Sequence, residues 1–134
     1  MADIVDPSRR SRMMAGIKGS DTTPERLVRS HLHRAALRFR LHGRDLPGRP
    51  DIVLPRWETV VFVHGCFWHR HKNCPNAATP SSNRAFWNRK FRENMARDAR
   101  NVAALRRLGW RVYVVWECRT SPRALDVLVR KIRQ

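Results

Sequence analysis

The sequence predicts an α/β fold, α+β-like in its element order, with a central mixed sheet that is flanked by helices. Three short apolar segments, residues 51–54, 58–64 and 110–117, have the length and composition of strands. A long helical pattern, residues 84–108, separates the second strand from the third. A helix between two strands suits the crossover that parallel pairing requires, whereas the short link between the first two strands suits an antiparallel hairpin. Because both kinds of pairing are expected, the sheet is mixed.

The composition limits the class of protein. A chain of 134 residues suits one hydrophobic core, and its 28 lysines and arginines against 11 acidic residues give a net charge of +17. Such a surface favours a phosphate backbone, because each neutralised phosphate releases counterions. A basic protein associated with the ribosome or with membranes is the alternative. The apolar runs are too short to cross a bilayer and the N-terminus shows no apolar signal segment, so we expect a cytoplasmic protein.

We expect the chain to have two parts. Residues 1–20 have little apolar content and are expected to form an arm or a short helix that lies on a partner. The cationic residues of this arm are Arg9, Arg10, Arg12 and Lys18. Residues 21–134 hold all the predicted helices and strands and are expected to form a single domain without internal repeats.

The first helix is predicted within residues 21–40. Thr22 and Glu25 form a capping box, and Pro24 lies in the first turn. Glu25 lies at the head of the apolar stripe rather than opposite it. The stripe has spacings of three and four residues and continues through Val28, Leu32, Ala35 and Phe39. Two interpretations follow: Glu25 only caps the helix, or it is a functional acid.

A hairpin is predicted to bring an acid and a histidine together. Residues 43–50, GRDLPGRP, form a loop rich in glycine and proline, and Asp51 opens the strand that follows. Pro55 and Arg56 turn the chain, and His64 closes the next strand. Antiparallel pairing across so short a turn places the start of one strand beside the end of the other. We therefore expect Asp51 and His64 at one edge of the sheet.

The long helix of residues 84–108 carries a second unusual acid. Its apolar stripe consists of Trp87, Phe91, Met95, Val102, Leu105 and Leu108. Asp98 occupies the position that completes the spacing between Met95 and Val102. Burial of even a neutral polar group without a partner costs about 2–7 kcal/mol, so this acid either forms an ion pair with one of the many arginines or has a function. Gly109 ends the helix, and residues 122–133 form a last helix.

A cluster of metal-ligating residues follows the second strand. The segment VHGCFWHRHKNC, residues 63–74, contains two cysteines and three histidines, and a third cysteine lies at the end of the last strand. Thiolate and imidazole are the ligands that tetrahedral zinc prefers. A closed, structural site would use Cys66, His71, Cys74 and Cys118. His69 is an alternative to His71 as the ligand, and three unrelated buried cysteines are the alternative to a metal site.

The residues left over can form a hydrolytic site. With the zinc ligands assigned, His64 and His69 remain, and Asp51 is expected near His64. A carboxylate can hold Mg²⁺ and activate water, and a histidine near neutrality can accept the proton of that water. Glu25 and Asp98 supply further carboxylates. The alternative is a DNA-binding protein that a zinc ion stabilises and that has no catalytic activity.

The sequence resembles a known family, the very short patch repair endonucleases. The matching segments are LPGRPDIVL at 46–54, VFVHGCFWHRHKNC at 61–74, FW at 86–87, the spacing of Asn94 and Asp98, and LGWRVYVVWEC at 108–118. The resemblance implies a restriction-endonuclease-like fold with a structural zinc site. It also implies a Mg²⁺-dependent hydrolysis that nicks the thymine strand beside a T:G mismatch, which arises when 5-methylcytosine is deaminated.

The resemblance assigns roles to individual residues. Magnesium is held by Asp51 and by the backbone carbonyl of the residue before the first histidine, which is Val63 here and a threonine in the family pattern. The other catalytic positions correspond to His64, His69, Glu25 and Asp98. The zinc ligands correspond to Cys66, His71, Cys74 and Cys118.

Aromatic side chains beside the site acquire a role from the resemblance. In the family, such side chains enter the duplex beside the mismatch, and the matching residues are Phe67, Trp68 and Trp87. Wedges of this kind unstack a base step at an energetic cost, and a mismatched step opens more easily. Met14 matches a residue that inserts from the opposite groove, so the basic arm would clasp the DNA. The alternative is that Phe67 and Trp68 belong to the core.

The family also suggests the setting in which the protein acts. We expect a monomer that acts on double-stranded DNA containing a T:G mismatch, with other DNA repair proteins as candidate partners. We expect it in the cytoplasm of a bacterium, associated with the nucleoid. A nuclease of the same fold without mismatch preference is the main competing interpretation.

Overall fold

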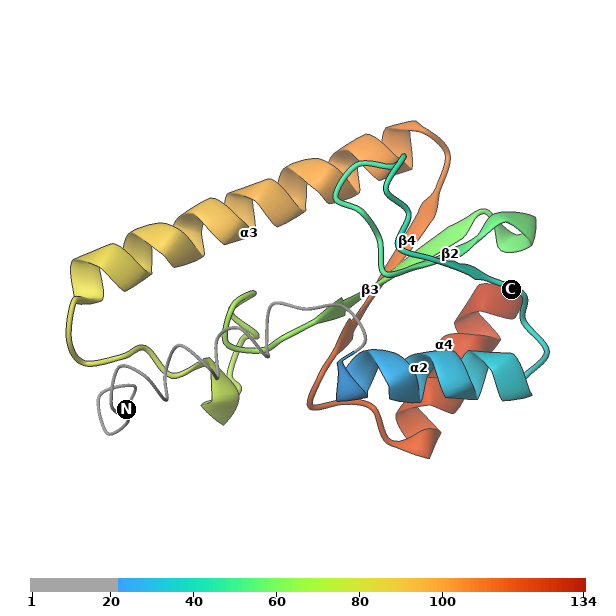
Figure 1. Cartoon of the computed structure of the whole chain (residues 1–134), viewed down its shortest axis with the longest axis horizontal. Helices are drawn as coiled ribbons and strands as arrows, with labels where there is room; N and C mark the ends of the chain where they lie inside the picture. The colour runs from blue at the N-terminus through green and yellow to red at the C-terminus, as the bar shows by residue number, and fades with distance from the viewer. Residues whose placement is uncertain (1–21) are drawn as a thin grey trace.

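The computed structural model describes residues 22–134, which form a sheet with helices on both sides (Figure 1). Met14 and the basic arm of residues 1–20 lie outside the described residues. The described elements, in chain order, are α2 (Thr23–Arg34), β1 (Arg40–Leu41), β2 (Ile52–Leu54), η2 (Pro55–Trp57), β3 (Thr59–His64), η3 (Pro75–Ala77), α3 (Arg84–Arg107), β4 (Arg111–Trp116) and α4 (Pro122–Arg133).

The sheet of residues 22–134 has the strand order β1-β2-β3-β4. β2 pairs antiparallel with both β1 and β3, whereas β3 and β4 pair parallel, so the predicted mixed sheet is confirmed. The register places Ile52 opposite Val61 and His64 opposite Trp116. β1 is not predicted from the sequence, because its two exposed residues are too few to form a periodic pattern.

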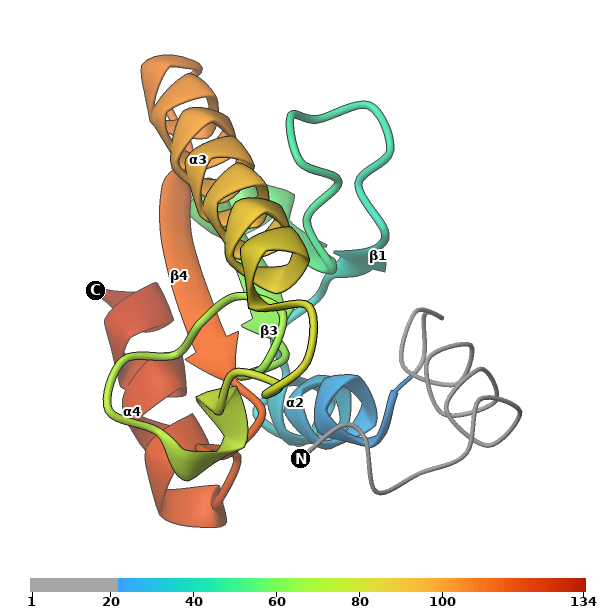
Figure 2. The same ribbon diagram turned by 90° about the vertical axis from the view of Figure 1, so that its left-hand side faces the viewer.

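Helices cover the two faces of the sheet (Figure 1 and Figure 2). α2 and α4 lie side by side on one face and share a core cluster with β2, β3 and β4. Its central side chains are Val28, Leu32, Ile52, Val61, Val115, Leu128 and Ile132. α3 covers the other face, and the side chains buried beneath it are Val53, Val60, Phe62 and Leu105. Alternate residues of β3 thus point to opposite faces, which explains why the whole strand is apolar.

α2 begins where the capping box predicts and ends earlier than its stripe suggests. The hydroxyl oxygen of Thr22 accepts the amide hydrogen of Glu25 at 3.4 Å. The helix ends at Arg34, and Ala36 has a φ of 62°, in the left-handed region. Phe39 therefore lies beyond the helix, although it still packs against the same core cluster.

α3 is longer than the sheet that it covers. Phe91 and Leu105 are buried, whereas Met95 is 50% exposed and Leu108 is 63% exposed, so two members of the predicted stripe lie outside the core. The N-terminal half of the helix lies over the loop that follows β3 (Figure 1) and contacts it through Phe91 and Phe67. Within residues 22–134, no helix has the length and apolar character needed to cross a membrane.

We expect Leu105→Ala to destabilise the protein by about 2–5 kcal/mol, because the truncation leaves a cavity between α3 and the sheet. Leu105 is fully buried, whereas Leu108 at the end of the same helix is 63% exposed. Leu108→Ala is therefore the matched control, with an expected change below about 0.5 kcal/mol. Urea denaturation followed by circular dichroism measures both free energies of unfolding. Equal losses in the two variants would contradict the packing of α3 on the sheet.

Candidate active site and metal centre

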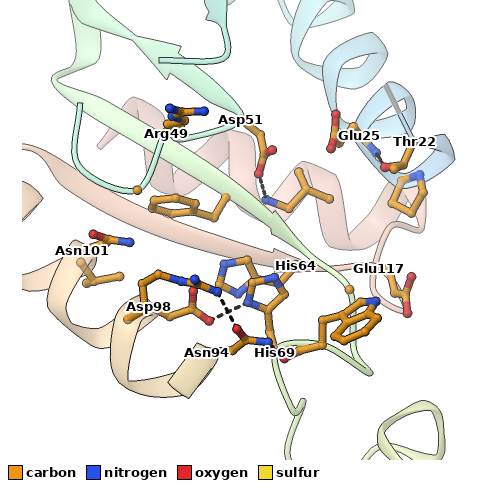
Figure 3. Close-up of a pocket in the computed structure, with 18 of the residues that line it drawn as sticks. Thr22, Glu25, Arg49, Asp51, His64, His69, Asn94, Asp98, Asn101 and Glu117 are labelled. Carbon is orange, nitrogen blue, oxygen red and sulfur yellow. Dashed lines mark hydrogen bonds and ion pairs between the residues drawn. The ribbon is translucent and has the colours of Figure 1, made fainter. Parts of the chain in front are cut away.

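One cavity collects the acids and histidines predicted for the site (Figure 3). It has a volume of about 1120 Å³ and lies between the N-terminus of α2, the start of β2, the end of β3 and α3. The predicted catalytic residues that line it are Glu25, Asp51, His64, His69 and Asp98. Val63, Trp68 and Trp87 line it as well. Segments far apart in the chain therefore meet here, in a cavity where polar groups converge between apolar and aromatic side chains, as in many enzymes.

Asp51 is held at the cavity wall by the hairpin and by the loop before it. Its Oδ2 accepts the amide hydrogen of Val63 at 2.7 Å, so residue 51 meets the end of β3 as the hairpin predicts. The preceding loop lies against α3 at Gly48, where an added Cβ would come within 2.8 Å of Asn101 and where φ is +75°. Glycine meets both constraints without strain. This glycine thus positions the acid that follows it.

The carboxyl group of Asp51 lies where a cation would stabilise it. Burial raises the pKa of Asp51 to about 6, against the opposing hydrogen bond from the Val63 amide. The negative charge of Glu25 adds to the rise, and His42 and His69 oppose it. Carboxylate oxygens are ligands that suit Mg²⁺, and a cation would relieve the repulsion between the two acids. The residues present therefore fit the predicted magnesium site.

His69 and Asp98 form a hydrogen-bonded pair (Figure 3). Nδ1 of His69, in the loop after β3, lies 2.6 Å from Oδ2 of Asp98 on α3. Burial alone would raise the pKa of Asp98, but the hydrogen bond to His69 and nearby positive charges outweigh it and leave the pKa below its usual range. An ionised carboxylate only accepts, so His69 donates through Nδ1 and keeps Nε2 free. The partner of Asp98 in this bond is a histidine, not an arginine as the simpler interpretation requires.

His64 lies flat against His69. Their ring centroids are 3.8 Å apart and their planes differ by 7°, while Trp116 packs edge-on against His64. Burial and, secondarily, the charge of His69 lower the pKa of His64 to about 4, against the opposing charge of Asp98. His64 is therefore a neutral ring at neutral pH.

The ligand atoms of His64, His69 and Asp98 lie within 4.8 Å of one another, which raises the question of a metal ion at this cluster. The nitrogen lone pairs of an imidazole lie in the plane of its ring. Two nearly parallel rings stacked 3.8 Å apart cannot both direct a lone pair at one ion. The geometry therefore suits acid–base chemistry better than metal binding.

Glu25 lies in the first turn of α2 and is only 7% exposed. The side chain of Thr22 accepts the amide hydrogen of Glu25, which is one of the two hydrogen bonds of a capping box. Glu25 lines the cavity, and its charge adds to the rise in the pKa of Asp51 that burial causes. Glu25 thus lies at the start of α2 and at the cavity wall, a position that is compatible with both interpretations.

The four predicted zinc ligands converge on one point. Nδ1 of His71 lies 3.5 Å from Sγ of Cys66 and 3.3 Å from Sγ of Cys118, and the sulfurs of Cys74 and Cys118 are 3.9 Å apart. Zinc bonds of about 2.0–2.3 Å in a tetrahedron require ligand separations of about 3.5–3.8 Å. The set therefore fits a closed zinc site in which the histidine is His71, while His69 belongs to the separate cluster with His64 and Asp98.

An aromatic cluster borders the cavity. Phe67 packs against Trp68 and Trp87 with ring centroids 5.0 and 5.7 Å apart, and the two tryptophans are 5.8 Å apart. Phe91 packs against Phe67 at 5.2 Å. Phe67 and Trp68 are half-buried and belong to neither core cluster of the sheet. The cluster is thus a separate aromatic surface at the rim of the cavity.

Glu117 and Asn94 are among the cavity residues that have no role in the sequence prediction. Glu117 accepts the amide hydrogen of Cys66 through Oε1 at 3.0 Å, and its own amide donates to the carbonyl of His64 at 2.9 Å. Asn94 donates through Nδ2 to the carbonyl of Trp68 at 3.4 Å. The sequence feature that could have identified these two residues is their position. Glu117 directly precedes the predicted zinc ligand Cys118 at a strand end, and Asn94 lies one helical turn before Asp98.

Comparison with known proteins decides the family. A sequence model described as DNA mismatch endonuclease Vsr matches residues 2–75. The chain belongs to the Vsr family. The Type II nicking enzyme V.XorIIP of Xanthomonas oryzae pv. oryzae is 48% identical over 133 residues, which cover 98% of this chain and 97% of the relative. The DNA mismatch endonuclease Vsr of Escherichia coli is 43% identical over 118 residues, which cover 88% of this chain and 75% of the relative.

A further relative, the Type II nicking enzyme V.NmeAIP of Neisseria meningitidis, is 42% identical over 138 residues, which cover 99% of this chain and 98% of the relative. Membership of the Vsr family confirms the predicted family and the enzyme class, so the chain is a DNA endonuclease. Together with the mixed sheet and its flanking helices, it also confirms the restriction-endonuclease-like fold.

We expect purified protein to contain about one zinc ion per chain and His71→Ala to lose most of it, because the site is left with three ligands. The melting temperature of this variant should fall, since bound metal joins the loop after β3 to the end of β4. His33→Ala, at an exposed histidine of α2, is the control. Elemental analysis and thermal denaturation measure both effects. Wild-type protein without zinc would contradict the assignment.

Proposed function

We propose that this Vsr-family endonuclease nicks the thymine strand of double-stranded DNA beside a T:G mismatch left by deamination of 5-methylcytosine, through Mg²⁺-dependent phosphodiester hydrolysis. The observation that carries the proposal is the cavity in which Asp51 and the pair of His69 and Asp98 lie beside an aromatic cluster. The E. coli relative is named a DNA mismatch endonuclease, and two others are named nicking enzymes. A net charge of +17 supports the same class of substrate.

Asp51 is the residue that would hold Mg²⁺, together with the backbone carbonyl of Val63. The amide of Val63 donates a hydrogen bond to the Asp51 carboxylate, so the backbone at this position lies beside the acid. A backbone carbonyl does not depend on the side chain, so valine in place of threonine keeps this ligand and removes only a hydroxyl. When bound, Mg²⁺ neutralises charge on the phosphate and on the leaving oxygen.

His69 is the group that accepts the proton of the attacking water. Its Nδ1 is engaged by Asp98, so Nε2 is the acceptor, and the ionised aspartate stabilises the imidazolium that results. The stacked, neutral ring of His64 keeps His69 in one orientation. Glu25 supplies a further carboxylate that orients water near Asp51.

Phe67, Trp68 and Trp87 are the side chains that enter the duplex beside the mismatch. Trp68 and Trp87 line the cavity and Phe67 packs against both, so a base step that they open would be next to the hydrolytic groups. A mismatched step is easier to unstack than a matched one, which gives a preference for T:G without direct base contacts. Residues 1–20, with Met14, form the arm that clasps the DNA, and residues 21–134 form the nuclease domain.

As proposed, the protein carries a structural zinc ion and acts in the bacterial cytoplasm. Zinc is held as a structural ion with no ligand position left for water, by Cys66, His71, Cys74 and Cys118. The protein acts as a monomer in the cytoplasm of a bacterium, at the nucleoid, with other repair proteins as candidate partners. The bacterial sources of the three relatives support this setting.

A strand-nicking assay tests the proposal. The substrate is a labelled duplex with one T:G mismatch, compared with its matched duplex, first with Mg²⁺ and then with a chelator. Asp51→Asn keeps the shape of the side chain and removes its charge, and we expect it to lower the nicking rate by about 10²–10³-fold. Asp45→Asn is the matched control, because Asp45 is an exposed acid of the same loop that is paired with Arg40.

The expected result is a nick in the thymine strand of the mismatched duplex that requires Mg²⁺ and is lost in Asp51→Asn. Equal cutting of both duplexes would leave a nuclease of this fold without mismatch preference. Salt-sensitive binding without any product would instead point to a DNA-binding protein without catalytic activity.

We expect the affinity for Mg²⁺ to fall as the pH drops below about 6. The pKa of Asp51 is raised to about 6, mainly by burial, so its carboxylate takes up a proton in that range and loses the charge that binds the cation. The apparent affinity should fall about tenfold per pH unit below this value and level off above it. Nicking rates measured against Mg²⁺ concentration at several pH values test this, because the Mg²⁺ concentration that gives the half-maximal rate reports the affinity separately from the maximal rate. A Mg²⁺ requirement that does not change with pH would contradict it.

The other titratable groups around Asp51 do not reverse this trend. Glu25 raises its pKa further, while His42 and His69 lower it, and the stated value already contains these effects. His64 has its pKa lowered to about 4 by burial, so it stays neutral through the range in which Asp51 titrates.

A further inference from the structure

Arg70 packs against the aromatic cluster. Its guanidinium carbon lies 3.9 Å from the ring centroid of Phe91 on α3 and 5.8 Å from that of Phe67. Cation–π contacts within about 6 Å are attractive, and more so where water is excluded. Burial lowers the pKa of Arg70 below its usual range, which agrees with a position that is partly shielded from solvent.

The same guanidinium group holds two parts of the zinc-binding loop. Nη1 donates to the backbone carbonyl of Phe67 at 3.2 Å, and Nη2 donates to the hydroxyl oxygen of Thr79 at 2.9 Å. Phe67 directly follows the ligand Cys66, and Thr79 lies beyond the ligand Cys74. One planar group thus joins both ends of the loop to α3. A lysine cannot replace it, because an ammonium group has neither the planar face nor the fixed fork of donors.

The backbone at Arg70 is also unusual. Its φ is 54°, in the left-handed region, which costs about 1–2 kcal/mol for a residue other than glycine. The turn is fixed by two backbone hydrogen bonds, from His69 to Gly65 at 3.1 Å and from His71 to Cys66 at 3.0 Å. Arg70 thus lies between a histidine of the cavity and a zinc ligand. Strain of this kind persists where the surrounding structure requires it, and it often marks a functional position.

We propose that Arg70 is a positioning residue for mismatch recognition, which clamps Phe67 and the adjoining Trp68 against α3 so that the rings meet a weakened base step as one rigid wedge. The inference rests on the proposed function, because it requires that the aromatic cluster enters the DNA. A wedge that moved freely would lose part of its binding energy in becoming ordered. Because the clamp already orders the rings in the free protein, this ordering cost does not arise when the DNA binds. The gain in binding energy is largest where a base step has to be opened.

The test compares two arginines that differ in their contacts. Arg70→Gln removes the cation and the stacked plane, whereas Arg92→Gln removes the same charge from an exposed position next to Phe91. Wild-type protein and both variants are assayed on the mismatched and matched duplexes, with 2-aminopurine beside the mismatch to report unstacking. We expect Arg70→Gln to lower kcat/KM on the mismatched duplex about tenfold beyond the control, which corresponds to about 1.4 kcal/mol. Its fluorescence increase should be smaller, while binding to the matched duplex weakens equally in both variants.

Equal losses in the two variants, with a wild-type fluorescence increase in Arg70→Gln, would overturn the inference. Zinc content is measured in parallel. If Arg70→Gln loses zinc or fails to fold, Phe91→Leu replaces it, because this change removes the stacked ring and keeps both hydrogen-bonding groups of Arg70. A normal unstacking signal in Phe91→Leu would then overturn the clamp. A wild-type protein that treats the two duplexes alike would instead overturn the proposed function, and the role of Arg70 with it.

Discussion

The parallel pairing of β3 with β4 is the constraint on which both candidate sites depend. His64 and Trp116 are opposite each other at the end of this pairing, and the amide of Glu117 extends it to the carbonyl of His64. Because the strands run in the same direction, the segments that follow them emerge at one edge of the sheet. The loop with the histidines thereby meets Cys118, although the whole of α3 lies between them in the chain.

The loop after β3 belongs to two clusters at once, and this couples them. His69 is hydrogen-bonded to Asp98 in the cavity, while His71 lies among the sulfurs of the predicted zinc site. Arg70, between the two histidines in the chain, has a left-handed backbone conformation. A zinc ion that fixes His71 therefore also limits where His69 can lie. Acid–base groups are most effective when they are held in place before the reaction begins. A metal ion at the second cluster would thus help to hold His69 in place although it leaves no ligand position for water.

Local patterns made much of the fold and site predictable. The cap at Thr22, the apolar runs of β3 and β4 and the spacing of cysteines and histidines each depend on a few neighbouring residues. The bond between Asp98 and His69 is different, because it joins a helix to a loop and depends on how α3 is rotated over the sheet. Exposure of Met95 has the same origin, since the helix extends beyond the sheet. The packing of Arg70 on the ring of Phe91 also leaves no sequence signal, because most arginines of so basic a chain lie in solvent.

The distribution of charge separates DNA binding from DNA cleavage. Acids are scarce in a chain with a net charge of +17, yet five of the 11 line the cavity: Glu25, Asp51, Glu93, Asp98 and Glu117. The protein as a whole attracts a phosphate backbone, whereas a wall of carboxylates repels a phosphate at short range. Arg49, Lys90 and Arg97 line the same cavity and offset part of this negative charge, and a cation bound among the carboxylates would offset more of it. Basic residues over the rest of the protein can therefore hold DNA without metal, whereas a cation between the carboxylates would favour the approach of a phosphate to them.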